Sequence, residues 1–353
     1  MVCADCRRCC FLCVLRRSVI HLRTVRSGTR SNPRSCREID TKARVTETAR
    51  SNPIRAERFL RELKASLAPA KGTYIYDACI RDSLEKTSPE DPSGYVEWLR
   101  RLLTALAPEK NGSGRKTLDV GCGTGALTVL MRLLGFDATG IDVHEQHVQL
   151  AKGLADENGL SKDMFVCDRG EKLPFPDQSF DIVTMISVLE HLDDAALAAL
   201  VPELARVCRG VLFVQAPNSA SLRDDHTGLL FVPWMPRWLA RAYVAGRGKR
   251  YRYYISSSGD WDVHYRNFDQ VTSVFGSYFD FSPSPRECCY PQTPEEYSPT
   301  RIGKRLRLSD RELFVGVPLP WRQFRISRGY PREAYDPYLN LILKPKRVRD
   351  DEN

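Results

Sequence analysis

A glycine-rich turn with nearby carboxylates holds the residues of this chain that are best suited to chemistry. The segment TLDVGCGTGALTVLMRLLGF (117–136) places Gly121, Gly123 and Gly125 after a short apolar stretch, and Asp119 precedes them. Glycines in such a turn let the backbone approach a ligand closely. A carboxylate beside the turn disfavours a doubly charged pyrophosphate and favours a ligand that carries cationic groups at that end.

A second carboxylate, Asp142, ends the segment TGID and lies 21 residues beyond Gly121. At the carboxyl end of a strand, this position suits a bidentate hydrogen bond to the two hydroxyls of a ribose. The sequence GCGTGA also satisfies the dinucleotide pattern G-x-G-x-x-G/A, with Ala126 in the last place. These residues alone therefore leave a nicotinamide-dependent oxidoreductase as an alternative.

Three histidines are candidate catalytic bases. His191 lies in SVLEHLDD, His226 in RDDHTGLLF and His264 in WDVHYRNF. An imidazole with an ordinary pKa of about 6.5 can take a proton from a phenol or another hydroxyl at neutral pH. For each of them, packing or hydrogen bonding within the fold is the alternative role.

The elements that must position these residues alternate along the chain. Short apolar segments predict strands at 117–120, 137–142, 164–168, 180–186, 211–216, 278–282 and 338–346. Amphipathic segments predict helices at 125–134, 144–158, 193–208 and 267–277. This alternation predicts an α/β fold, with a doubly wound, mostly parallel sheet and helices on both of its faces.

The chain divides into a core with additions. Residues 1–50 are a head, 51–112 are N-terminal helices, 113–216 are the cofactor-binding core, 264–346 complete the core, and 347–353 are a tail. One N-terminal helix ends before Pro69, and another carries Tyr95 and Trp98 on its apolar face. Insertions interrupt the core at 217–263 and at about 283–336. We expect HTGLLFVPWMPRWLARAYV, in the first insertion, to form a lid over the open edge of the sheet.

Three motifs, in order along the chain, resemble the class I S-adenosylmethionine-dependent methyltransferases, especially the methyltransferase-11-like branch of small-molecule enzymes. They are LDVGCGTG, TGIDVHEQHVQLAK and FVCDRGEKLPFPDQSFDIVTMISVLEHL. The resemblance covers about 113–218, and more weakly 264–282 and 337–346. It implies a Rossmann-like methyltransferase fold with helical lid insertions, S-adenosyl-L-methionine as the cofactor and a small molecule as the methyl acceptor.

The same resemblance implies roles for individual residues. It puts Asp119 near the amino-acid end of the cofactor, Asp142 at the ribose and Asp168 at the adenine amino group. The complete predicted cofactor site is Asp119, Gly121, Cys122, Gly123, Gly125, Asp142, Val143, Asp168, Arg169 and Ser187. No metal ligand is predicted. One departure is that Gly210 stands where the family usually has a Pro-Gly-Gly turn, which leaves the strand register there less defined.

Charge and cysteines concentrate in the head. The net charge is +9, but residues 1–37 hold nine arginines, one acidic residue and six of the twelve cysteines. Such a head is typical of an organellar targeting peptide or of a disordered segment. We expect a soluble cytoplasmic protein, or a mitochondrial or other organellar one if the head is a targeting peptide. The nearly neutral remainder makes nucleic acid an unlikely partner.

Two basic runs fall in the insertions, RGKRYRYY at 247–254 and RIGKRLRLSDR at 301–311. They suit a phosphorylated, acidic or lipid-linked acceptor, or peripheral contact with a membrane. The sequence leaves open the identity of the acceptor, the methylated atom and the oligomeric state. A catalytically silent methyltransferase-like binding module is the second alternative function.

Overall fold

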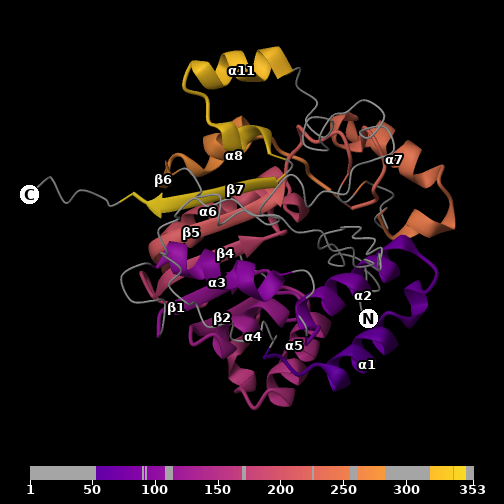
Figure 1. Cartoon of the computed structure of the whole chain (residues 1–353), viewed down its shortest axis with the longest axis vertical. Helices are drawn as coiled ribbons and strands as arrows, with labels where there is room; N and C mark the ends of the chain where they lie inside the picture. Colours follow the sequence, from indigo (N-terminus) through magenta and orange to yellow (C-terminus); the bar gives the residue numbers. More distant parts are fainter. Residues whose placement is uncertain are drawn as a thin grey trace, which may run out of the picture.

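Seven strands form one sheet in the order β3-β2-β1-β4-β5-β7-β6 in a computed structural model of the protein (Figure 1). The structure describes residues 53–89, 91, 94–107, 114–168, 172–224, 226–254, 261, 263–282, 319–336 and 338–346. The predicted head and tail, Arg169, the basic run 301–311 and most of the second insertion lie outside the described residues.

The sheet is parallel except at one edge. Its strands are β1 (Lys116–Val120), β2 (Asp137–Asp142), β3 (Phe165–Cys167), β4 (Phe180–Ile186), β5 (Cys208–Pro217), β6 (Phe279–Ser282) and β7 (Tyr338–Pro345). Strands β1 to β5 pair in parallel, and β7 is antiparallel to both β5 and β6. The predicted doubly wound, mostly parallel sheet is confirmed. The central strands β1, β4 and β5 are buried along most of their length, because helices cover both faces.

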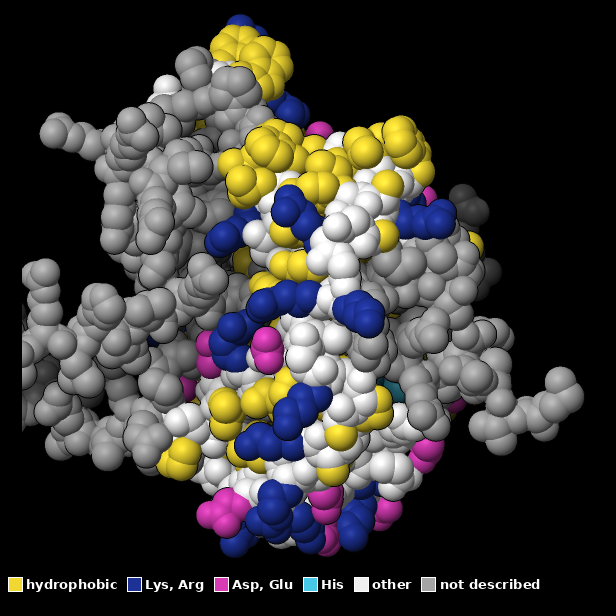
Figure 2. Space-filling view, turned by 90° about the vertical axis from the view of Figure 1, so that its right-hand side faces the viewer, with side chains coloured by type: hydrophobic (Ala, Val, Ile, Leu, Met, Phe, Trp, Pro, Cys, Tyr) yellow, Lys and Arg dark blue, Asp and Glu magenta, His cyan; other side chains and the backbone are white. Residues whose placement is uncertain are grey.

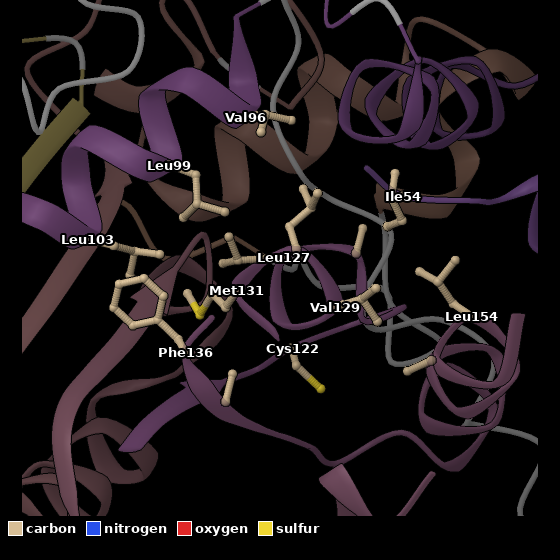
Figure 3. Packing of buried hydrophobic residues seen from close by; sticks show 14 of the residues in the cluster. Ile54, Val96, Leu99, Leu103, Cys122, Leu127, Val129, Met131, Phe136 and Leu154 are labelled. Atoms are coloured by element: carbon tan, nitrogen blue, oxygen red, sulfur yellow. The ribbon is translucent and has the colours of Figure 1, made fainter. Parts of the chain in front are cut away.

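Two clusters of buried hydrophobic residues lie on opposite faces of the sheet. The first packs under α1 (Glu57–Ser66), α3 (Tyr95–Leu106), α4 (Ala126–Leu133) and α5 (Glu145–Glu157). The second packs under α6 (Asp194–Val207) and α8 (Phe268–Phe275). Neighbouring residues of β4 alternate between them, with Ile182 in the first and Val183 in the second. Figure 3 shows side chains of α3 and α4 converging in the first cluster.

Helix α2 (Tyr74–Thr87) was not predicted by the sequence analysis. Its segment, YIYDACIRDSLEKT, lacks a clean apolar stripe because charged residues occupy its inward side. Asp82 and Lys86 form an ion pair of 2.9 Å, and their side chains are only 15% and 16% exposed. A search for amphipathic periodicity misses a helix of this kind.

The first insertion forms a small unit of its own. Helix α7 (Arg237–Ala245) buries Ala240 and Val244 against Trp261 and Val263, together with Ile75 of α2. Helix α11 (Leu319–Ser327) belongs to the second insertion and lies beyond α8 at the top of Figure 1. Among the helices that the structure describes, none combines the length and apolar character that a membrane span needs.

The irregularity expected at Gly210 lies between β4 and β5. The register shifts between the pairs Phe180–Cys208 and Ile182–Val211. A Cβ atom on Gly210 would overlap the carbonyl oxygen of Asp181. We therefore expect Gly210→Ala to lower the free energy of unfolding by about 1–3 kcal/mol, measured by urea denaturation.

Gly153→Ala is the matched control for this substitution. Gly153 lies inside α5, and its added Cβ would contact only the flexible carboxylate end of Glu62, at 3.2 Å. Because alanine is the better helix former, this change should leave stability equal or raise it by up to about 1 kcal/mol. Equal losses of stability in the two variants would contradict the assignment of a steric role to Gly210.

Candidate active site

A cavity of about 480 Å³ lies at the carboxyl ends of β1, β2 and β4. The residues that follow these three strands line it, including Gly121, Val143 and Ser187. Strand β1 lies between β2 and β4. The strands β2 and β3 extend the sheet on one side of β1, and β4 and β5 extend it on the other side. This is the switch point at which open α/β sheets bind their ligands.

The glycine turn forms the floor of this cavity. Gly121 and Gly123 both have positive φ, at 71° and 53°. The N–H groups of Gly121 and Cys122 donate to the carbonyl oxygen of Ile141, at 2.8 and 3.1 Å, which ties the turn to β2. A Cβ atom on Gly121 would overlap the side chain of Val188, so this position requires glycine.

Gly125 lies behind the turn, away from the cavity lining. It is the N-cap of α4 with a φ of 84°, and an added Cβ would lie 2.6 Å from Ala151 and 2.8 Å from Phe165. This glycine therefore has a packing role, because it lets α4 approach α5 and β3. Its predicted contact with the cofactor stays a prediction.

Asp142 ends β2 at the cavity wall and is 4% exposed. Its carboxylate accepts hydrogen bonds from the N–H of Gly123 and the N–H of His144, both at 2.9 Å. Burial by itself raises the pKa of Asp142, but hydrogen bonds from His144 and His147 outweigh it and hold the pKa below its usual range. The group is ionised at neutral pH, and carboxylate lone pairs remain for a further donor.

The remaining predicted cofactor residues also lie at this edge. Asp168, Val143, Cys122 and Ser187 line the cavity. The N–H of Asp168 donates to the carbonyl oxygen of Asp142 at 3.1 Å, which brings the two acidic residues together. Ser187 has a φ of 56° and its N–H donates to Gln215, so the chain turns sharply after β4.

Two of the three candidate bases are neighbours. His191 lines the cavity, and its ring centroid lies 5.6 Å from that of His226, which is 4% exposed. Nδ1 of His226 is 3.0 Å from the hydroxyl of Tyr265, and that hydroxyl donates to the carboxylate of Asp224. Nε2 of His226 lies 3.9 Å from the Glu190 carboxylate. The ring of His226 thus packs edge-to-face against that of His191.

The side chain of His264 lies outside this cavity. It lines a second cavity of about 360 Å³, together with Arg237 and Arg266. Burial lowers the pKa of His264, and the charges of these two arginines lower it further. The side chain of His264 therefore lines a different cavity from that of His191, although the N–H of His264 donates to the carbonyl oxygen of Glu190 at 2.7 Å.

Two groups of side chains have the spacing of metal ligands. The ligand atoms of Glu190, His191 and His226 lie within 4.8 Å of one another, and so do those of Asp142, His144 and His147. Imidazole and carboxylate groups can bind a divalent cation, and they can equally form an acid–base network. The first group could not be predicted from the sequence, because His226 is distant along the chain from Glu190 and His191.

Comparisons with known proteins agree with this geometry. Residues 117–210 match the family model of a methyltransferase domain. A ubiquinone biosynthesis O-methyltransferase of Pasteurella multocida is 32% identical over 159 residues, which are 39% of this chain and 63% of that enzyme. A 2-methyl-6-phytyl-1,4-hydroquinone methyltransferase of Synechocystis is 38% identical over 115 residues, 32% of this chain and 34% of the relative.

The chain therefore contains a methyltransferase domain at residues 117–210, similar to class I S-adenosylmethionine-dependent methyltransferases. It spans less than two thirds of the length of either relative. A solved S-adenosylmethionine-dependent methyltransferase of Mesorhizobium loti is 17% identical, with a TM-score of 0.43 over 71% of this chain and 98% of that one.

The wall of the cavity opposite the sheet comes from the N-terminal helices. Cys79, Asp82, Ser83 and Lys86 of α2 and Tyr95 of α3 line it. Burial raises the pKa of Asp82, although Lys86 acts in the opposite direction. Among the described residues of 217–263, none lines this cavity, so the expectation that this insertion covers it as a lid is not met. Helix α2 takes that place.

Asp119 is a deeply buried acidic group at this site, with 2% exposure. Its two oxygens accept hydrogen bonds from the hydroxyls of Thr128, at 2.7 Å, and Thr184, at 3.0 Å. Burial raises the pKa of Asp119 to about 6, although the two threonines act in the opposite direction. The folded protein therefore holds this proton more tightly than the unfolded chain does.

This shift predicts the effect of Asp119→Asn on stability. The ionised carboxylate destabilises the fold above about pH 6, and the penalty disappears as the pH falls through about 4, the ordinary value. The variant should be more stable than the parent at pH 8, by up to about 3 kcal/mol, and the difference should vanish near pH 4. Urea unfolding at a series of pH values measures it. A variant less stable than the parent at pH 8 would show that the buried charge is net stabilising.

Proposed function

We propose that this chain transfers a methyl group from S-adenosylmethionine to a ring hydroxyl of a small quinol-type aromatic acceptor. The observation that carries the proposal is one cavity that brings together the glycine turn, the ionised Asp142 and His191. The names of the two relatives support this acceptor class, since one concerns ubiquinone and the other a hydroquinone.

The residues at the edge of the sheet fit the cofactor. Because Gly121 and Gly123 have no side chains, their backbone is exposed at the floor of the cavity. Asp142 offers an ionised carboxylate to a ribose. Asp168 lies beside Asp142, which supports its assignment to the adenine amino group. The volume of about 480 Å³ lies within the range of small-molecule sites. We assign these four residues to cofactor binding.

The chain contributes alignment, desolvation and proton removal. S-adenosylmethionine, when bound, supplies an electrophilic methyl group. Apolar residues, among them Leu127, Leu173 and Leu200, line the cavity and keep water from the acceptor. His191 would accept the proton that the acceptor hydroxyl must lose on methylation. The buried carboxylate of Glu190, beside His226, favours the resulting positive charge.

Acceptor-dependent turnover tests this proposal. The full chain is incubated with S-adenosylmethionine and a short-chain hydroxylated quinol, and S-adenosylhomocysteine and the methylated ring are measured by mass spectrometry. We expect both products in equal amounts, and neither with the same ring after its hydroxyls have been capped. Cofactor binding without turnover on any phenol, amine or carbon acceptor would instead favour the silent binding module.

A further inference from the structure

Five large hydrophobic side chains of the first insertion point into solvent. We call Leu230, Phe231, Trp234, Trp238 and Leu239 the α7 patch. Trp238 is 70% exposed, and the other four are 37–47% exposed. Figure 2 shows hydrophobic side chains gathered across the upper part of this face of the molecule, with basic side chains next to them. Exposed aromatic residues in a contiguous group are typical of an interaction surface.

The outward direction of these side chains is set by packing beneath them. Ala240 and Val244 of α7 are 1% and 0% exposed and face the buried cluster that contains Trp261. Trp238 therefore lies on the outer side of a helix that is anchored on its inner side. Phe231 has a φ of 67°, and its ring centroid is 5.6 Å from that of Trp234. The patch is a built feature of the folded insertion.

The segment that carries the patch is basic. Residues 226–254 contain six lysines and arginines and no aspartate or glutamate. Arg237 is held by the carbonyl oxygens of Trp261 and Val263. Arg241, Arg247, Lys249 and Arg250 are exposed, and Arg250 pairs at 3.8 Å with Asp77, itself 55% exposed. The segment thus combines protruding tryptophans with accessible cations.

We propose that the α7 patch docks on the surface of a lipid bilayer that contains anionic headgroups. Tryptophan rings favour the boundary between headgroups and acyl chains, and nearby arginines and lysines attract anionic lipid phosphates and carboxylates. Charge disfavours a second copy of this chain as the occupant, because a symmetric contact would set arginines against arginines.

Docking in this way would bring the active site close to the bilayer. Tyr251, which follows α7, stacks on Tyr74 of α2 with ring centroids 5.4 Å apart. Helix α2 also forms one wall of the cavity. An acceptor with an apolar tail could then reach the site from the membrane. The docking itself does not depend on the proposed methyl transfer.

Vesicle sedimentation tests the docking with the full chain. The parent, Phe231→Ser/Trp238→Ser and the control Trp321→Ser/Phe324→Ser are mixed with phosphatidylcholine vesicles, with and without phosphatidylserine. Trp321 and Phe324 are also exposed, at 55% and 47%, but belong to α11. We expect the first pair of substitutions to lower the partition coefficient at least about tenfold and the control pair to leave it near the parent value.

A second variant separates the charge from the aromatic contribution. Arg241→Gln should lower binding about fivefold on vesicles that contain phosphatidylserine, and should leave binding to phosphatidylcholine alone unchanged. Brominated lipids should quench the parent's tryptophan fluorescence, and less so in Phe231→Ser/Trp238→Ser. If Phe231→Ser/Trp238→Ser leaves the partition coefficient on vesicles unchanged, the proposal is overturned. A parent dimer that the same substitutions dissociate in the absence of vesicles would also overturn it, because the patch would then bind a second copy.

Discussion

Replacing His191 by alanine should lower turnover by about 10²- to 10⁴-fold, the usual contribution of a positioned general base. His191 lines the cavity, whereas the predicted cofactor residues Asp142 and Asp168 follow other strands. Cofactor affinity should therefore stay near the parent value, and the loss should appear in kcat. The pH–rate profile should also lose its lower limb, because only the neutral imidazole accepts a proton.

His264→Ala is the matched control. It removes the same side chain from the separate cavity beside Arg237 and Arg266. We expect it to keep parental turnover within a few fold and the parental pH profile. If His191→Ala behaves as His264→Ala does, His191 is structural, and the proton acceptor must be sought at His226 or in solvent.

Replacing Asp142 by alanine should weaken cofactor binding by about 2–4 kcal/mol, which corresponds to roughly 30- to 1,000-fold in Kd. The substitution removes the carboxylate proposed for the ribose hydroxyls. It also removes the acceptor for the N–H of Gly123, so the turn that faces the cofactor loses part of its support. Isothermal titration with S-adenosylmethionine measures the change.

Asp137→Ala is the control on the same strand. Asp137 lies at the opposite end of β2, where its 45%-exposed side chain forms an ion pair of 2.7 Å with Arg132. Loss of a surface pair should cost at most about 1 kcal/mol of stability and leave cofactor affinity unchanged. Parental affinity in Asp142→Ala, with the melting temperature retained, would refute the ribose assignment.

The sheet could be predicted because the sequence patterns that indicate its strands are local. Short apolar runs such as 117–120 and 180–186 lie between amphipathic helices, and parallel strands buried on both faces give that pattern. The carboxyl ends of such strands meet at one edge, so Gly121, Asp142 and Ser187 were expected to lie together. The structure places all three around the same cavity.

Other features depend on contacts that a linear reading does not contain. Helix α2 has a buried Asp82–Lys86 pair on its inner side, so its periodicity did not identify it as a cavity wall. The apolar character of the segment around Trp238 suggested a buried lid, yet only one side of α7 is buried. The contact between His191 and His226 likewise arises from tertiary folding.

Parallel titrations of the full chain with S-adenosylmethionine and with NAD distinguish a methyltransferase from a nicotinamide-dependent enzyme. We expect saturable binding of S-adenosylmethionine, with stabilisation of the fold by about 2.7 kcal/mol at a hundred times its Kd, and no such response to NAD. Binding and stabilisation by NAD, with no response to S-adenosylmethionine or S-adenosylhomocysteine, would refute S-adenosylmethionine as the cofactor.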